Sequence, residues 1–182
     1  MGKREVSPVN EEHFLRLIEF CKEIIQICLR NGVIPIIHGS FASFYYIKDR
    51  NIKVNDIDLL IPENSYKMLI RGLKKNKIEY TYVPKWHTLI IKRGDPRVEL
   101  DSKDFHYFDR ERNKELPGDF KDLDFYGMKI KMLSFDSLLA FYKLAYNRSI
   151  EDKEKLFKKI KRLEKLKKID LVMPEMAHIS SH

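Results

Sequence analysis

A short apolar strand that ends in a Gly-Ser turn constrains the fold of this chain more than any other feature. The run of residues 33–37 is apolar and rich in β-branched side chains, which predicts a buried strand over residues 34–38. Gly39 and Ser40 end this run, and a helical pattern begins at residue 41. The first backbone N–H groups of a helix lack intrahelical partners and can face an anion. The sequence therefore predicts a strand, a tight turn and a helix with space for an anion at the turn.

Two aspartates follow on a second predicted strand, residues 56–61. Because strand side chains alternate, Asp56 and Asp58 point to one face of this strand, while Ile57 and Leu59 point to the other. Two carboxylates that project together into one site suit Mg²⁺ ions that bridge substrate phosphates. The pattern therefore predicts a metal and nucleotide site beside the Gly-Ser turn.

A third acidic position lies in a predicted hairpin. Its strands, residues 87–93 and 97–102, are separated by a Gly-Asp-Pro turn. Glu99 and Asp101 share one face of the second strand, so either carboxylate could join the first pair. We favour Asp101, because the shorter side chain holds octahedral Mg²⁺ with less freedom, and Glu99 is the alternative.

Taken in order, these residues resemble the DNA polymerase beta-like nucleotidyltransferase superfamily. The shared pattern is a Gly-Ser turn and helix, then Asp-x-Asp between apolar residues, then a lone carboxylate on a later strand. The string from His38 to Ala42, followed by Asn55 to Leu60, is most similar to the minimal branch of that superfamily. This branch holds antibiotic nucleotidyltransferases, small stand-alone nucleotidyltransferases and toxins of the abortive-infection type. The resemblance covers roughly residues 34–166.

The resemblance implies Mg²⁺-dependent or Mn²⁺-dependent transfer of NMP from an NTP to a hydroxyl of a small molecule, a protein or RNA. The implied catalytic and metal-binding residues are Asp56, Asp58 and Asp101. The implied nucleotide-binding residues are Gly39, Ser40 and Lys143. A catalytically silent module of the same fold, which binds nucleotide or a partner as in a toxin–antitoxin pair, is the alternative. Activity is favoured, because buried like charges without a metal are unfavourable.

Several further residues have both a structural and a functional interpretation. His38 is expected to be a hydrogen-bonded core histidine. Arg50 and Lys53 precede the acidic pair and could contact a triphosphate or lie in solvent. Trp86 could stack on a base or an acceptor, but covering a sheet edge is the commoner role. Lys143 could equally extend from the edge of the core into solvent.

The charge balance favours an anionic partner such as NTP or RNA. The 182 residues include 35 Lys and Arg against 27 Asp and Glu, a formal net charge of +8. Much of this charge lies in a lysine-rich run over residues 155–168, which we interpret as the solvated face of a C-terminal helix. No RNA-recognition signature accompanies the charge, so the sequence names no acceptor.

The cysteines and the hydropathy pattern indicate a reduced, intracellular protein. Cys21 and Cys28 lie on one face of the first predicted helix, as a reduced pair in the core would. No uncharged span of eighteen residues and no secretory segment is present. We therefore expect a cytoplasmic protein without a membrane partner.

The coarse pattern predicts one α/β domain, a mixed sheet with helices packed on it. Further strands are expected at residues 78–83 and 126–132, and helices at residues 10–31 and 64–75. Two closing helices should begin at the N-caps Ser134 and Ser149. Residues 1–33 would form the N-terminal amphipathic helix, 34–132 the catalytic sheet region and 134–168 the C-terminal helices. Residues 105–124 and the tail 169–182 are expected to be irregular.

Overall fold

The computed structural model describes residues 11–49, 51–106, 108–109, 114–115, 118–149 and 151–172. Its helices are α1 (Glu11–Arg30), α2 (Gly39–Ile47), α3 (Tyr66–Lys75), α4 (Lys103–His106), α5 (Phe135–Arg148) and α6 (Lys153–Val172), with short 3₁₀ helices η1 (Glu63–Ser65) and η2 (Pro84–Trp86). Its strands are β1 (Ile36–His38), β2 (Asp56–Ile61), β3 (Tyr80–Val83), β4 (Thr88–Lys92), β5 (Arg97–Ser102), β6 (Phe108–Asp109), β7 (Lys114–Glu115), β8 (Phe120–Phe125) and β9 (Met128–Leu133).

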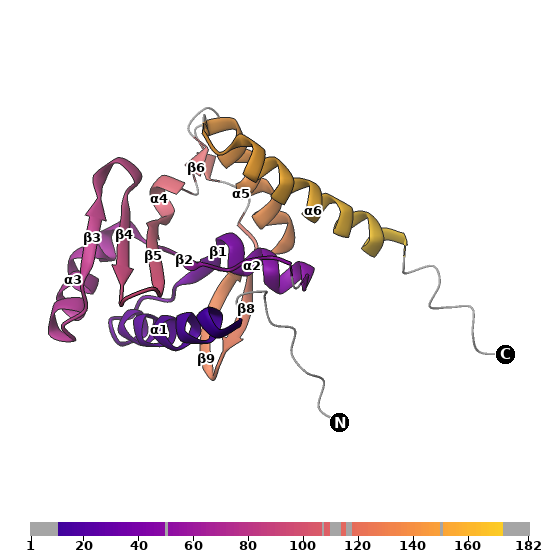
Figure 1. The fold of residues 1–182 in the computed structure, drawn as a ribbon. Coiled ribbons are helices and arrows are strands. Elements are labelled where there is room, and N and C mark those ends of the chain that lie inside the picture. Colours follow the sequence, from indigo (N-terminus) through magenta and orange to yellow (C-terminus); the bar gives the residue numbers. More distant parts are fainter. Residues whose placement is uncertain are drawn as a thin grey trace, which may run out of the picture.

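Seven strands form one mixed sheet in the order β3-β4-β5-β2-β1-β9-β8 (Figure 1). At its centre β1 pairs antiparallel with β2 and parallel with β9, and β2 pairs parallel with β5. The outer pairs β3–β4, β4–β5 and β8–β9 are antiparallel. The sheet and its flanking helices confirm the α/β fold class predicted from the sequence.

Helix α1 buries an apolar stripe against the sheet. Its buried residues recur at helical spacing and include Leu17, Ile24 and Ile25, and the helix contacts β2, β5 and α3. Cys21 and Cys28 lie on this stripe as free, buried thiols, which confirms the reduced core pair. Burial raises the pKa of Cys28 to about 12, so this thiol stays protonated at neutral pH.

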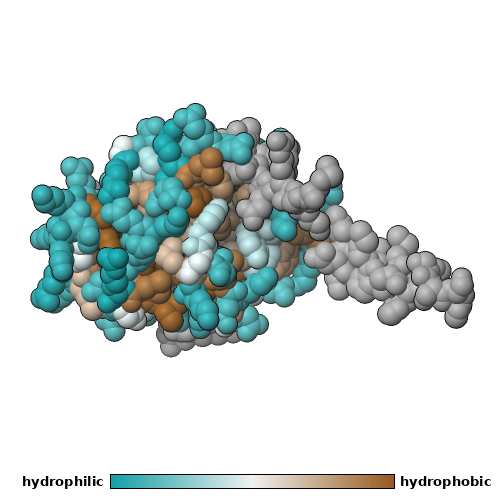
Figure 2. Space-filling view, turned by 90° about the horizontal axis from the view of Figure 1, so that it is seen from below, coloured by the Kyte–Doolittle hydropathy of each residue, from teal (hydrophilic) through white to brown (hydrophobic). Residues whose placement is uncertain are grey.

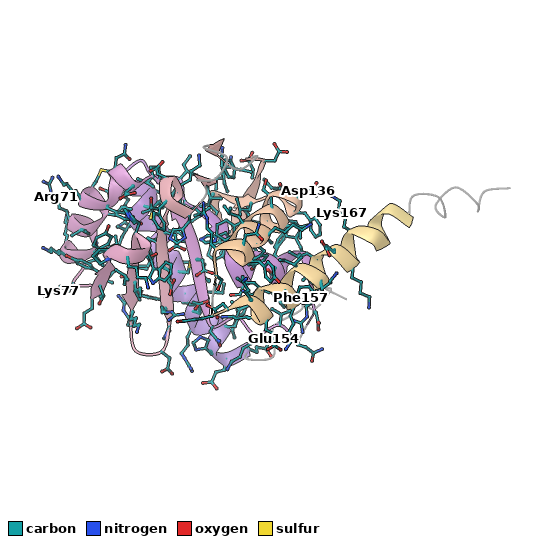
Figure 3. The ribbon with its side chains drawn as sticks, turned by 90° about the horizontal axis from the view of Figure 1, so that it is seen from above. Arg71, Lys77, Asp136, Glu154, Phe157 and Lys167 are labelled. Carbon is teal, nitrogen blue, oxygen red and sulfur yellow. The ribbon has the colours of Figure 1, made fainter. Side chains whose placement is uncertain are left out.

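Helices α5 and α6 form an antiparallel pair that closes the other end of the molecule. Ser134 caps α5 as predicted, because its Oγ accepts a hydrogen bond from the backbone N–H of Ser137. Lys167 of α6 lies 2.6 Å from Asp136 at the start of α5, and Figure 3 shows the two side chains together. The C-terminal part of α6 extends past the sheet (Figure 1).

Two sequence expectations about irregular segments are wrong for the described residues, whereas residues 107, 110–113, 116–117 and 173–182 of these segments lie outside them. Residues 105–124 were expected to be irregular, yet they include the end of α4 and most of β8. Strand β8 is a polar edge strand without clear alternation, so its pairing with β9 decides its conformation. The last helix also continues to Val172 rather than ending at Lys168, and the next proline in the sequence is Pro174.

The surface on the α1 side is largely hydrophilic. Figure 2, a view from below Figure 1, shows mostly hydrophilic side chains with smaller apolar areas between them. Within the described ranges, no helix combines the length and apolarity that a membrane crossing requires.

Candidate active site

Three carboxylates meet where β2 and β5 run side by side. The parallel register places Asp58 beside Glu99, and Asp101 lies two residues further along the same face of β5. One carboxylate oxygen from each of Asp58, Glu99 and Asp101 lies within 4.8 Å of the others. Three acids this close repel one another unless a cation or protons compensate their charge. The cluster therefore has the donor set and the spacing of a divalent-cation site.

Asp56 lies outside this set of three. It is two residues before Asp58 on the same face of β2, and it forms an ion pair with Arg97, its register partner on β5. Ser40 Oγ donates a long hydrogen bond of 3.4 Å to Asp56 Oδ1. Of the three acids chosen from the sequence, the structure thus brings Asp58 and Asp101 together and holds Asp56 beside Arg97 and Ser40.

Asp101 is the most deeply held of these acids. Its side chain is buried at 6% residue exposure, and its two oxygens accept hydrogen bonds from His38 Nε2 (3.0 Å) and Thr88 Oγ1 (2.6 Å). Burial disfavours its ionisation, but the hydrogen bonds and the positive charge of His38 outweigh that effect and lower the pKa of Asp101. The hydrogen-bonded core histidine expected at position 38 is confirmed. His106 Nε2 lies 3.7 Å from Asp101, and burial lowers the pKa of His106 although the charge of Asp101 opposes the shift.

In contrast to Asp101, Asp58 and Glu99 have raised pKa values. Burial, together with the charges of Asp56 and Asp101, raises the pKa of Asp58 to about 6, although His38 opposes the shift. Burial and the charges of Asp58 and Asp101 raise the pKa of Glu99 to about 7, with Arg97 opposing. At neutral pH Glu99 is therefore partly protonated, whereas Asp58 is mostly ionised, and a bound cation would favour the ionised form of both carboxyls.

The turn between β1 and α2 brings a helix start against these acids. Gly39 has φ of 65°, and a Cβ atom at this position would overlap the side chain of Asp58. Only glycine fits both the left-handed conformation and this close approach. Ser40 follows in the first turn of α2, and Ser43 Oγ hydrogen-bonds Tyr142 Oη at 2.8 Å. The strand–turn–helix predicted from the sequence thus lies directly beside Asp58.

Lys159, which the sequence analysis assigned to a solvated helix face, lies at the site. The Nζ of Lys143, the residue implied by the resemblance, is 2.9 Å from Glu164, and its side chain is half exposed. Lys159 of α6 instead lies over the Tyr142 ring, at 5.0 Å from its centroid. Burial lowers the pKa of Lys159, and the nearby charges of Asp58, Asp56 and Asp152 oppose that shift. A signal was available in the sequence, since Lys155, Lys159 and Arg162 recur at helical spacing on one face.

Two cavities flank Lys159. The first, of about 480 Å³, is named here the serine-side cavity and is lined by Ser40, Ser43, Ile47, Ile52, Lys53, Glu151, Asp152, Glu154, Lys155, Lys158, Lys159 and Arg162. The second, of about 360 Å³, is the aspartate-side cavity and is lined by His38, Gly39, Asp58, Trp86, Asp101, Phe105, His106, Phe141, Tyr142, Ala145, Arg148, Ser149, Asp152, Lys155, Leu156 and Lys159. Asp152, Lys155 and Lys159 line both cavities, which therefore meet at α6.

Lys53, Trp86 and Arg50 are the remaining residues for which the sequence left a structural and a functional role open. Lys53 lines the serine-side cavity. Trp86 is 52% exposed on η2 at the aspartate-side cavity, with Lys85 Nζ 4.8 Å from its ring centroid. Arg50 lies outside the described residues.

Comparison with solved structures identifies the fold. No family model and no curated protein matches the sequence. Among solved structures, the chain is similar to the antibiotic-resistance factor ANT(2″)-Ia in complex with adenylyl-2″-tobramycin, with a TM-score of 0.57, 11% identity and coverage of 88% of this chain and 98% of that one. The lincosamide antibiotic adenylyltransferase LnuA, bound to lincomycin, gives a TM-score of 0.55, 13% identity and coverage of 88% and 99%. An antigenic nucleotidyltransferase-like protein from Paracoccidioides brasiliensis gives 0.56, 17% identity and coverage of 81% and 74%.

These likenesses span most of the chain. At such low identity they establish the fold and leave the acceptor open. The resemblance read from the Gly-Ser turn and the Asp-x-Asp strand is therefore confirmed at the level of architecture. This chain has the fold of the minimal nucleotidyltransferases, the group that includes the antibiotic adenylyltransferases.

Proposed function

We propose that this protein is a nucleotidyltransferase that uses Mg²⁺ or Mn²⁺ and transfers NMP from an NTP to a hydroxyl group. One observation carries the proposal: oxygens of Asp58, Glu99 and Asp101 lie within 4.8 Å of one another, directly beside the Gly39 turn at the start of α2. Helix starts favour phosphate, and clustered carboxylates favour hard divalent cations. The fold shared with antibiotic adenylyltransferases supports the same reaction.

The donor set fits such ions. All candidate ligand atoms are carboxylate oxygens. Burial and the neighbouring carboxylate charges raise the pKa values of Asp58 and Glu99, so a bound cation would favour their ionised forms. Asp56, Asp58 and Asp101 are the proposed ligands, and Glu99 is close enough to replace Asp101 in that role. Asp56 would then exchange its ion pair with Arg97 for the cation. When bound, the ions would supply Lewis-acid stabilisation of the charge that develops on the transferred and leaving phosphates.

The residues of the chain supply the remaining contributions. Ser40 and the backbone N–H groups at the start of α2 donate to the triphosphate, because those groups have no intrahelical partners. Lys159 adds a cation from the opposite wall, where it lines both cavities. Asp101, kept ionised by His38, or Glu99 accepts the proton of the attacking hydroxyl. An NTP donor also favours a cytoplasmic location.

The test combines binding and turnover. Mg²⁺ with an NTP should raise the melting temperature, because a ligand that binds only the folded state stabilises it. An α-labelled NTP should then pass its label to an acceptor in a cell extract, with release of unlabelled pyrophosphate. A thermal shift without any labelled product, over all four NTPs, would indicate a silent nucleotide-binding module instead.

A further inference from the structure

The two cavities meet at Asp152, Lys155 and Lys159 but differ in their other lining residues, and this difference assigns them different parts of the reaction. In phosphoryl transfer the attacking and leaving oxygens lie roughly in line, on opposite sides of the phosphorus. The serine-side cavity contains Ser40 and is lined by five Lys and Arg residues against three carboxylates, those of Glu151, Asp152 and Glu154, so its excess of positive charge suits the departing pyrophosphate. The aspartate-side cavity contains Asp58 and Asp101 and therefore lies where the attacking hydroxyl must be.

Aromatic side chains form much of the wall of the aspartate-side cavity. Trp86 stands at this wall with about half of its surface exposed. Phe105 stacks on His87, with ring centroids 4.4 Å apart and an interplanar angle of 15°. Phe141 packs edge-on against His38 from α5. Flat rings in the lining of one cavity favour a flat ligand, because stacking gains most from parallel or edge-on aromatic contact.

The charges of the same cavity select an anion. Arg148, Lys155 and Lys159 line it, whereas Asp152 is its one carboxylate, among the described residues, outside the proposed metal ligands. Lys85 adds a further cation beside the Trp86 ring. A polyamine acceptor would meet like charge at these positions, which is unfavourable. Stacking rings next to cations are the combination that binds nucleotides.

We propose that the aspartate-side cavity is the acceptor subsite and that it takes a nucleotide, with the ring on Trp86 and a phosphate near Arg148 and Lys155. This inference rests on the proposed nucleotidyl transfer. The acceptor hydroxyl oxygen forms a bond to the α-phosphorus of the NTP while the bond from that phosphorus to the β-phosphate oxygen breaks. Pyrophosphate leaves, and the hydroxyl proton passes to the adjacent carboxylate. A free nucleotide and the 3′ end of a nucleic acid strand share this chemistry.

The experiment supplies α-labelled NTP and Mg²⁺ with three kinds of acceptor: nucleoside monophosphates, a single-stranded oligonucleotide with a free or a blocked 3′ end, and the polyamine tobramycin. Label should appear on a nucleotide acceptor and not on tobramycin. Transfer to the monophosphates would identify a free nucleotide as the acceptor. Transfer only to the unblocked oligonucleotide would identify the 3′ end of a strand as the acceptor. Trp86→Ala should raise the KM for that acceptor about tenfold, an effect within the range of base–aromatic stacking, with kcat and the Kd for Mg²⁺-NTP unchanged.

Tyr126→Ala is the matched control, because Tyr126 is 53% exposed and lies outside the described lining of both cavities. Trp86→Ala should fold normally, since Thr88 and His106 hydrogen-bond the backbone carbonyl of Trp86, which the substitution keeps. Label on tobramycin would overturn the inference, as would a Trp86→Ala change that weakens NTP binding instead. Stabilisation by Mg²⁺-NTP without transfer to any nucleotide would also overturn the inference, although the protein would still bind the NTP. Absence of that stabilisation would refute the proposed function itself.

Discussion

Replacing Asp58 with asparagine should stabilise the protein in the absence of metal. Asp58 is held beside Glu99 and Asp101, and a Cβ at Gly39 would overlap its side chain, so its ionised form is poorly solvated. Asparagine has nearly the same shape and carries no charge. The change therefore removes repulsion while it preserves packing.

The magnitude follows from the pKa of Asp58, which burial and neighbouring carboxylates raise from 3.8 to about 6. A difference of about 2 pKa units corresponds to a free energy of unfolding of roughly 2–3 kcal/mol. Because the folded-state pKa is raised, ionisation favours the unfolded chain. The destabilisation is absent below about pH 4, grows between about pH 4 and pH 6, and is complete above that range. Asp58→Asn should gain stability over the same window.

Thermal melting in chelator, at pH 3.5 and pH 8, measures this difference. A gain of 2–3 kcal/mol should raise the melting temperature by about 5–10 °C at pH 8, given roughly 2–4 °C per kcal/mol for a chain of this size. Asp122→Asn is the control, because it removes the same charge from an exposed position on β8. Mg²⁺-NTP should then stabilise the parent but not Asp58→Asn. If Asp58→Asn melts no higher than Asp122→Asn at pH 8, or if its gain persists at pH 3.5, the electrostatic reasoning is wrong.

Three further predictions concern individual residues. Ser40→Ala should weaken NTP binding by on the order of 1–3 kcal/mol in calorimetry with saturating Mg²⁺, and an unchanged Kd would mean that the serine contacts no phosphate. Lys159→Met should weaken NTP binding about tenfold or more, whereas Lys143→Met should leave it unchanged, since the half-exposed side chain of Lys143 pairs with Glu164. Glu99→Gln should raise the melting temperature in chelator, and Asp101→Asn should lower stability by on the order of 3–5 kcal/mol, because it leaves a buried histidine without its ionic partner. The larger fall in kcat between these two variants identifies the base.

The local parts of the site could be predicted from the sequence because they depend on neighbouring residues. The Gly39–Ser40 turn follows from the end of an apolar run and the start of a helical pattern. The shared face of Asp56 and Asp58, and that of Glu99 and Asp101, follow from the two-residue period of a strand. The identity of the fold followed from the order of these pieces along the chain.

The tertiary structure alone decided which of these side chains meet. Parallel pairing of β2 with β5 places Asp58 beside Glu99 and Asp56 beside Arg97, with which it forms an ion pair. The register of this pairing cannot be predicted from the local sequence of either strand. The docking of α6 brings Lys159 to the acids, although the sequence of that helix reads as a solvated basic face. Contacts between segments far apart in the chain depend on how whole elements pack. The sequence therefore shows which acids share a strand face and which basic residues share a helix face, but only the packing of α6 decides that Lys159 faces the acids.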